Sequence, residues 1–276
     1  MALSITNNIA ALNAYQNLTD VQNKLTGSIS KLSSGNAITN AGDNAAGLAI
    51  STGLTSQVNG LNVAATNAQS GLDVVQTASG ALTQVTSMLQ RLRDLAVQAA
   101  NDSNSTASRS DIQTEATSIT DELTRVSSAT NYNGTKLLDG SAAALNFQVG
   151  ANAGTDNTIT VNLSSINVGA MATTLAALTF DSNANSQLAI TAVDGALGTV
   201  STAQATLGAT ENRFTSTIAS VNIASQNLNS ASSQITSTDM AKQMVIFTGE
   251  QVQSQAATAI LAQANQLPQG ILKLLG

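Results

Sequence analysis

Apolar residues recur at every seventh position over two long stretches of the chain. In residues 54–96 they are Leu54, Leu61, Ala68, Val75, Leu82, Leu89 and Ala96. In residues 193–235 they are Val193, Val200, Leu207, Phe214, Val221, Leu228 and Ile235. This period is typical of a helix that buries one stripe against a partner. The pattern predicts two long helices, the first roughly 63 Å long at 1.5 Å per residue.

Both predicted long helices contain residues that break the pattern. The first includes Gly53, Gly60, Gly71 and Gly80, each of which costs up to about 1 kcal/mol relative to alanine. We expect close approach of another helix to compensate for them. The second includes Gln204 and Glu211 within its stripe. These two side chains either specify the register of a helix pair or lie at a water-facing edge.

The middle of the chain contains a shorter predicted helix and the β-strand signal. Apolar residues from Ile112 to Val126 follow a helical spacing, and Ser110 with Gln113 predicts a capping box at the start of this helix. Alternating apolar residues near 145–149 and 159–163 flank a Gly/Asn/Asp-rich link and predict a β-hairpin. Residues 164–185 give no clear signal.

Both ends of the chain have helical apolar stripes with no partner in their own quarter of the sequence. A thin stripe of Leu and Ile cannot bury itself, so we expect the first and last quarters to pair. The predicted fold class is mainly α. It is a long antiparallel helical hairpin, or coiled-coil rod, with the N- and C-terminal helices paired and a small β-hairpin region in the middle.

Composition excludes several kinds of chemistry. The 276 residues include no Cys and no His, so thiol nucleophiles, disulfides and His- or Cys-based metal sites are excluded. The net charge of −6 disfavours nucleic-acid binding, which needs a basic surface. The acidic pair Asp121 and Glu122, and Asp94 beside Arg93, are typical of solvated helix faces. We expect no enzymatic activity and no cofactor.

Charge is unevenly distributed along the chain. Residues 1–43 and 236–276 each carry two acidic and two basic residues, so the whole charge of −6 lies between residues 44 and 235. Sparsely charged ends indicate surfaces that become covered, and a charged middle indicates a surface left in water. The ends therefore predict an inner assembly domain, and the middle predicts a domain on the outside.

Several segments together resemble bacterial flagellin, the subunit of the flagellar filament. Near the N-terminus these are NNIAALNAYQNL, KLSSGNAITNAGDNAAGLAIS and LQRLRDLAVQAAND, followed by DELTRVSSATNYNGTKLLDG and NFQVGAN. Near the C-terminus they are LGATENRF, NLNSASSQITSTDMA and ILAQANQLPQGILKLL. The chain departs from the family pattern at Asn36-Ala37, at Gly42-Asp43-Asn44 and at Met240.

The resemblance implies a minimal flagellin without the outer variable domains. Residues 1–43 and 236–276 would form an inner terminal coiled coil, and residues 44–235 a rod domain with the β-hairpin near 145–163. The ends would be disordered in the monomer and would order on assembly. The residues expected to make the inner coiled coil are Ile5, Ile9, Leu12, Leu18, Leu25, Leu32, Met244, Phe247, Ile260, Leu267, Ile271 and Leu274.

The resemblance also implies partners and a location. The chain would polymerise helically with itself, and an export chaperone, a filament cap and hook–filament junction proteins would handle it. It would leave the bacterium through the flagellar type III apparatus and lie outside the cell. No cleaved signal peptide and no membrane span are expected from the sequence. The alternative function is the hook–filament junction protein, which shares the terminal helices.

A host protein is a further implied partner. Residues Gln90, Arg91, Leu92, Arg93 and Leu95, with Glu115, resemble the flagellin patch that the animal innate flagellin receptor binds. The alternative is that Leu89 and Leu92 belong to the apolar stripe and that the arginines bridge protofilaments.

Overall fold

The computed structural model describes residues 8–142, 144–164 and 166–275, with side chains described up to residue 266. The chain divides into two compact units. The first unit contains residues up to Ser56 together with those from Asn227 onward, and the second contains Gln57–Gln226. The predicted boundary between an inner domain and a rod domain, near residues 43 and 236, concerns the assembled state and stays a prediction.

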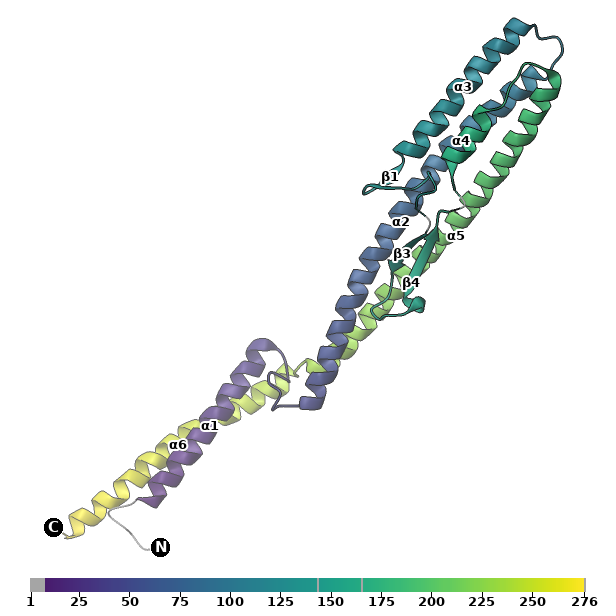
Figure 1. Cartoon of the computed structure of the whole chain (residues 1–276). Helices are drawn as coiled ribbons and strands as arrows, with labels where there is room; N and C mark the ends of the chain where they lie inside the picture. Colours follow the sequence, from purple (N-terminus) through teal and green to yellow (C-terminus); the bar gives the residue numbers. More distant parts are fainter. Residues whose placement is uncertain (1–7, 143, 165, 276) are drawn as a thin grey trace. The chain divides into compact units, whose positions relative to one another are not determined.

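The prediction of a mainly α chain with a small β-hairpin region is confirmed (Figure 1). In the first unit lie α1 (Ile9–Ser34) and α6 (Met240–Leu275). The second unit includes α3 (Thr106–Ala129), α4 (Val168–Ala176) and four strands: β1 (Asn131–Tyr132), β2 (Thr135–Lys136), β3 (Ala144–Gln148) and β4 (Thr158–Asn162). The two long helices, α2 (Ala45–Ala99) and α5 (Asn183–Thr236), contribute to both units.

Within the second unit, α2 and α5 run antiparallel and in constant register. Hydrogen bonds join Asn62 to Ser225 at 3.0 Å and Gln76 to Glu211 at 3.0 Å. A third joins Arg93 to Asp194 at 2.6 Å. The residue numbers of each pair have the same sum, as in a straight antiparallel pair. Glu211 therefore lies at a half-exposed edge and contacts the facing helix.

The core of the second unit fills the space between α2, α3, α4, α5 and the β3–β4 hairpin. The seven-residue stripe of α2 supplies Leu82 and Leu89, and α5 supplies Leu207 and Phe214, all at most 1% exposed. The rings of Phe214 and Phe147 on β3 meet edge to face, with centroids 5.6 Å apart. The hairpin pairs Leu145 with Val161 and Phe147 with Ile159, so the predicted alternation is confirmed.

Residues 164–185, which give no clear signal in the sequence, complete this core. Asn167 caps α4 by accepting a hydrogen bond from the Ala170 amide at 2.8 Å. The helix buries Val168, Ala172 and Leu175, and Phe180 beyond it is only 1% exposed. This segment thus contributes to the core of the second unit, in which α4 contacts α3.

The predicted start of α3 is wrong, because the capping residue lies five residues earlier in the chain. The helix begins at Thr106, and Ser105 caps it by accepting a hydrogen bond from the Ser108 amide at 3.1 Å. Ser110 and Gln113 lie inside the helix instead, where Gln113 binds the chain beyond α4 at Leu178 and Phe180. Gln113 is therefore a tertiary contact and no part of a cap.

The glycines of α2 have two different environments. A Cβ added to Gly71 would lie 2.5 Å from Phe214 Cζ, and one added to Gly60 would lie 2.9 Å from Ala151 Cβ. Close approach explains these two glycines, as predicted, although the neighbour of Gly60 is a loop. Nothing lies within 4 Å of a Cβ at Gly53 or Gly80, so the prediction is wrong there within the subunit.

Substitution of these glycines should have opposite effects. We expect Gly71→Ala to lower the free energy of unfolding by about 1–3 kcal/mol, because the buried Phe214 ring cannot move without disturbing Phe147. Gly80→Ala, at an exposed position of the same helix, should raise it by up to about 1 kcal/mol. Thermal unfolding of the soluble subunit, followed by circular dichroism, measures both changes. Equal effects of the two substitutions would contradict this account.

Candidate assembly surfaces

The helices α1 and α6 pack side by side and antiparallel in the first unit (Figure 1). At one end of the pair, Asn8 Nδ2 donates to the Ala264 carbonyl oxygen at 2.8 Å. Further along, Ser28 Oγ donates to Glu250 Oε2 at 2.5 Å. Beyond α1, Asn36 pairs with Ser237 in an isolated antiparallel bridge. The predicted pairing of the N- and C-terminal helices is confirmed by these contacts.

The contact between α1 and α6 is a seam of residues spaced alternately by four and three. The buried and half-buried positions on α1 are Ala11, Ala14, Leu18, Val21, Leu25, Ser28 and Leu32, with Lys31 beside the last of them. Those on α6 are Gln243, Phe247, Glu250, Ser254, Ala257, Leu261 and Ala264. This is the a/d spacing of a coiled coil. The α6 side of the seam carries three polar side chains, so the seam is only partly apolar.

The residues predicted for the inner coiled coil fall into three groups. Leu18, Leu25, Leu32 and Phe247 are half-buried in the seam. Ile9, Leu12, Met244 and Ile260 are exposed on other faces, by 49–60%. Ile5 lies outside the described residues, as do the side chains of Leu267, Ile271 and Leu274. Of the eight predicted residues whose side chains the structure describes, four therefore lie in the seam and four are exposed in a single subunit.

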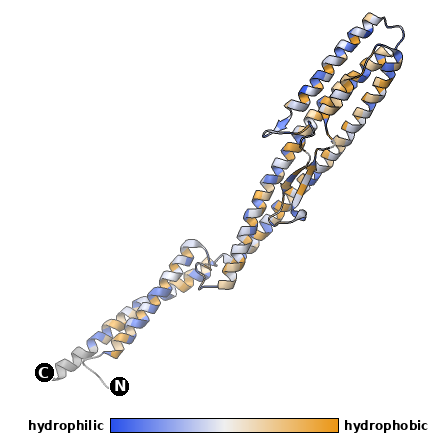
Figure 2. Ribbon diagram, in the orientation of Figure 1, coloured by the Kyte–Doolittle hydropathy of each residue, from blue (hydrophilic) through white to orange (hydrophobic). Residues whose placement is uncertain are grey.

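Exposed apolar side chains are concentrated in the first unit. Of the fifteen large apolar residues that are exposed among those described, eleven lie in this unit, which is the smaller of the two. On α1 and α6 they are Ile9, Leu12, Tyr15, Ile29, Met240, Met244, Val245, Ile246, Val252 and Ile260. In Figure 2, hydrophobic positions recur along both helices between hydrophilic ones. We call these ten residues the open apolar face.

The loop between α1 and α2 is held by one carboxylate. Asp43 forms an ion pair with Lys31 at 3.0 Å and accepts hydrogen bonds from the amides of Thr39 and Asn40, each at 3.0 Å. Lys31, and then these amides, hold the pKa of the Asp43 carboxyl well below its usual range. The ionised carboxylate therefore shapes the loop at neutral pH.

The chain departs from the family pattern at Asn36-Ala37 and at Asn44, and hydrogen bonds hold the backbone near both positions. The Ala37 amide donates to the Thr236 carbonyl oxygen at 2.7 Å, and the Thr238 amide donates to that of Gly35 at 2.9 Å. Gly35 has a φ of 71°, which a glycine adopts without strain. Asn44 accepts a hydrogen bond from the Gly47 amide at 2.9 Å. Met240, at the third departure, is exposed.

Two residues of the patch predicted for a host receptor are buried, and the other four are accessible. Leu92 and Leu95 are each 1% exposed and pack inside the second unit. Within the subunit these two leucines are core residues, and Leu89 and Leu92 belong to the apolar stripe, as in the alternative. Contact of the patch with a receptor stays a prediction. Gln90, Arg91, Arg93 and Glu115 stay accessible as a polar face.

Both arginines of this polar face are paired within the chain. Arg91 contacts Glu115 on α3 at 2.6 Å, and Arg93 contacts Asp194 on α5 at 2.6 Å. Hydrogen bonding to Asp194 raises the pKa of Arg93 further above its usual value. The arginines thus bridge helices of the subunit itself.

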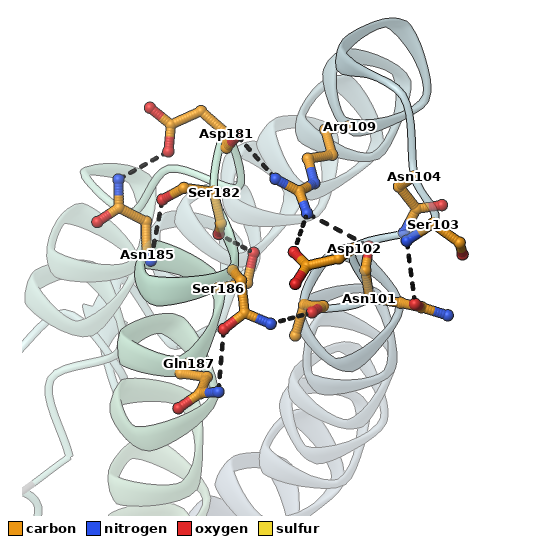
Figure 3. Close-up of polar contacts among 12 residues, drawn as sticks. Asn101, Asp102, Ser103, Asn104, Arg109, Asp181, Ser182, Asn185, Ser186 and Gln187 are labelled. Atoms are coloured by element: carbon orange, nitrogen blue, oxygen red, sulfur yellow. Dashed lines mark hydrogen bonds and ion pairs between the residues drawn. The ribbon is translucent and has the colours of Figure 1, made fainter.

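Sequence reasoning missed a polar cluster where α2 ends and α5 begins (Figure 3). Arg109 on α3 donates to the backbone carbonyl oxygens of Asp181 and Asn101, at 3.1 and 3.3 Å. It also pairs with the Asp102 carboxylate at 3.1 Å. Asn183 donates to the Ala100 carbonyl oxygen. The partners of Arg109 are mostly backbone oxygens, which leave no signal in the residue pattern.

Asp181 is the acidic residue on the α5 side of this cluster. Its carboxylate accepts a hydrogen bond from Asn185 Nδ2 at 2.7 Å. That hydrogen bond, followed by those from Ser182 and Thr179, lowers the pKa of Asp181 below 3.8. The folded state thus favours the ionised carboxylate just before the N-terminus of α5.

Two other kinds of site are absent from the described part of the chain. No group of three or more acidic side chains is placed there to hold a metal ion. No helix among the same residues is long and apolar enough to cross a bilayer.

The chain is similar to known proteins over nearly its whole length. The bacterial flagellin N-terminal helical region matches residues 5–143, and the bacterial flagellin C-terminal helical region matches residues 190–275. A flagellin of Halalkalibacterium halodurans is 42% identical over 271 residues, which are 98% of this chain and 99% of that protein. A flagellin of Bacillus subtilis is 39% identical over 307 aligned residues, covering 99% of this chain and all of that protein.

A solved structure agrees with these matches. The crystal structure of Bacillus cereus flagellin has a TM-score of 0.51 and 25% sequence identity, and covers 56% of this chain and 88% of that one. The stretch between the two matched regions, 144–189, holds β3, β4 and α4. These elements pack into the core of the second unit, as in a minimal member of the family.

The pH dependence of the polar cluster can be tested at Asp181. Its pKa is lowered in the folded state, so its ionised form stabilises the second unit above pH 3.8, and this contribution is lost as the pH falls through the lowered pKa. We expect Asn185→Ala to raise the pKa of the Asp181 carboxyl toward its ordinary value. Gln187→Ala is the control, because Gln187 binds Asn183 and not Asp181. Carbon-detected NMR titration of the soluble subunit measures the pKa, and an unchanged value in Asn185→Ala would refute the assignment.

Proposed function

This chain belongs to the bacterial flagellin family and is a structural subunit of the flagellar filament, and we propose that copies assemble through the α1–α6 pair. The observation that carries this proposal is the open apolar face. Ten large apolar side chains on two paired helices are left in water by a single subunit. Each of them is 41–71% exposed, so complete burial by a neighbouring copy would contribute about half of a full side-chain burial, roughly 0.8–1.5 kcal/mol.

The chemistry of the two ends supports the same role. Residues 1–43 and 236–276 carry no net charge, so packing many copies of these segments together costs little electrostatic repulsion. A filament needs a head-to-tail contact between unlike surfaces that does not close into a ring. The open apolar face meets that need when it packs against a different face of the next copy. Ordering of both ends on assembly stays a prediction.

The filament subunit is favoured over the hook–filament junction protein. Both matched regions are flagellin regions, and the relatives that cover nearly all of this chain are named flagellins. The proposal assigns no catalytic role to the chain. Of the acidic pair Asp121 and Glu122, Glu122 is held by Arg125 at 2.6 Å on the surface of α3, as expected of a solvated helix face.

We also propose where the protein works and which partners handle it. Export through the flagellar type III apparatus to the outside of the cell follows from the family, as do an export chaperone, a filament cap and junction proteins as partners. The absence of cysteine from the sequence is compatible with passage of an unfolded chain between compartments of different redox potential.

The assembly proposal predicts that a charge on the open apolar face blocks polymerisation. We expect Val252→Asp to raise the critical concentration for filament formation at least about tenfold, because a buried, unpaired carboxylate costs several kcal/mol. Val252 is 65% exposed in the subunit, so unfolding of the monomer should not change. Thr173→Asp, on the exposed surface of α4, introduces the same charge elsewhere as a control. Sedimentation of filaments measures the effect, and normal polymerisation of Val252→Asp would overturn the proposal.

We also propose that the polar face of Gln90, Arg91, Arg93 and Glu115 is what a host innate flagellin receptor would contact. Arg91→Ala should weaken signalling by that receptor about tenfold or more, as expected when an interface arginine is lost. Arg125→Ala is the matched control, since Arg125 is also an exposed arginine paired with a glutamate on α3. A cell reporter assay with polymerisation-competent variants measures both, and equal signalling by the two variants would reject the patch.

Thermal unfolding of Leu95→Ala tests the core and not this patch. Because Leu95 is buried, its truncation should instead lower the free energy of unfolding by about 2–5 kcal/mol.

A further inference from the structure

The seam between α1 and α6 contains a polar network that joins the two helices. Ser28 Oγ donates to Glu250 Oε2 at 2.5 Å and accepts a hydrogen bond from Gln243 Nε2 at 3.1 Å. Ser28 is only 5% exposed, although serine is usually found at the surface. The rest of the α1 seam is apolar, so Ser28 is an exception at a core position.

The apolar part of the seam does not by itself determine how the two helices align. Leu18, Leu25 and Leu32 follow each other at intervals of seven residues on α1, and Phe247 and Leu261 are two such intervals apart on α6. A shift of one helix by seven residues, about 10.5 Å, again places seam positions opposite seam positions. Hydrophobic burial distinguishes such alignments only weakly, because it is not directional.

The polar network distinguishes the observed alignment of the two helices from alignments shifted by one heptad. Gln243 and Glu250 are themselves seven residues apart, and Ser28 binds both. After a shift by one heptad in either direction, Ser28 can meet at most one of them. The other side chain then faces the seam without this partner, and a buried polar group that loses its partner is costly.

The surroundings of Glu250 strengthen this dependence. Lys24 and Lys31 line the same hollow as Ser28, Gln243 and Glu250. Lys31, however, is engaged by Asp43 at 3.0 Å, and among the described residues no ion pair within 4 Å joins Lys24 to Glu250. Ser28 is thus the donor that holds the Glu250 carboxylate across the seam.

We infer that Ser28, Gln243 and Glu250 together set the axial register of the α1–α6 pair. A single polar residue in an otherwise apolar seam has this effect in coiled coils. The inference rests on the proposed assembly role of this pair, because the register matters for the surface that the pair offers to neighbouring copies. In a filament, a subunit paired in the wrong register would present the open apolar face displaced by about two helical turns.

The register can be measured by the distance between two labels. The chain contains no cysteine, so Asn13→Cys and Thr248→Cys, at exposed positions of α1 and α6, provide the only attachment sites for a pair of spin labels. Labelled subunits are polymerised with a large excess of unlabelled wild-type subunits, so that distances within one subunit dominate. Pulsed electron paramagnetic resonance should then give a single distance for the wild-type seam.

Two variants of the labelled subunit test the network. Replacing Ser28, Gln243 and Glu250 together by Leu removes the network and leaves Ser254 as the one polar side chain of the seam. This variant should add a second distance displaced by up to about 10 Å. Ser28→Ala removes one hydroxyl and should add the same second distance in smaller amount. Ser30→Ala, an exposed serine two residues away, is the control and should keep the single distance.

The result that overturns the inference is one unchanged distance in both variants. If the triple variant does not enter filaments, Ser28→Ala alone decides by the same criterion. Failure of the assembly proposal is seen separately, as normal polymerisation of Val252→Asp, and does not alter the distances within a subunit.

Discussion

Burial of a narrow apolar stripe between antiparallel helices is the interaction on which the rest of this subunit depends. Most of the stability of a helix in a protein comes from packing of its apolar stripe, so each long helix needs a partner along its length. In the second unit, α2 has that partner in α5, and α3, α4 and the β3–β4 hairpin complete the core around them. In the first unit the seam is thinner and contains three polar residues on α6. The difference explains why one unit is closed and the other leaves apolar surface for other copies.

Periodicity allowed much of this fold to be predicted from the sequence. The stripes from Leu54 to Ala96 and from Val193 to Ile235 lie in α2 and α5, and the alternation around Phe147 and Ile159 is the β3–β4 hairpin. These signals are strong because the buried residue recurs at a fixed interval set by backbone geometry. The short helix α4 was not predictable, because its nine residues are too few to show a period and its burial comes from α3 and Leu138.

The candidate sites were less predictable than the fold, for two physical reasons. A resemblance in sequence transfers a patch as a run of neighbours, but a helix turns successive residues to different faces, so Leu92 and Leu95 enter the core while Arg91 stays in water. The Arg109 cluster depends on the carbonyl oxygens of Asn101, eight residues away, and of Asp181, 72 residues away. Every residue has a backbone carbonyl oxygen, so the residue pattern does not predict which of these oxygens will accept a hydrogen bond from Arg109.

The three cross-helix contacts of the second unit have a mechanical consequence. Asn62–Ser225, Gln76–Glu211 and Arg93–Asp194 are spread over 31 residues of α2, a length of roughly 46 Å. Packing of apolar stripes is not directional, so by itself it resists sliding of α2 along α5 only weakly. Directional contacts at three heights oppose that sliding at each height. The two helices are therefore coupled along their axes, and a load applied to one of them along its length is carried by both.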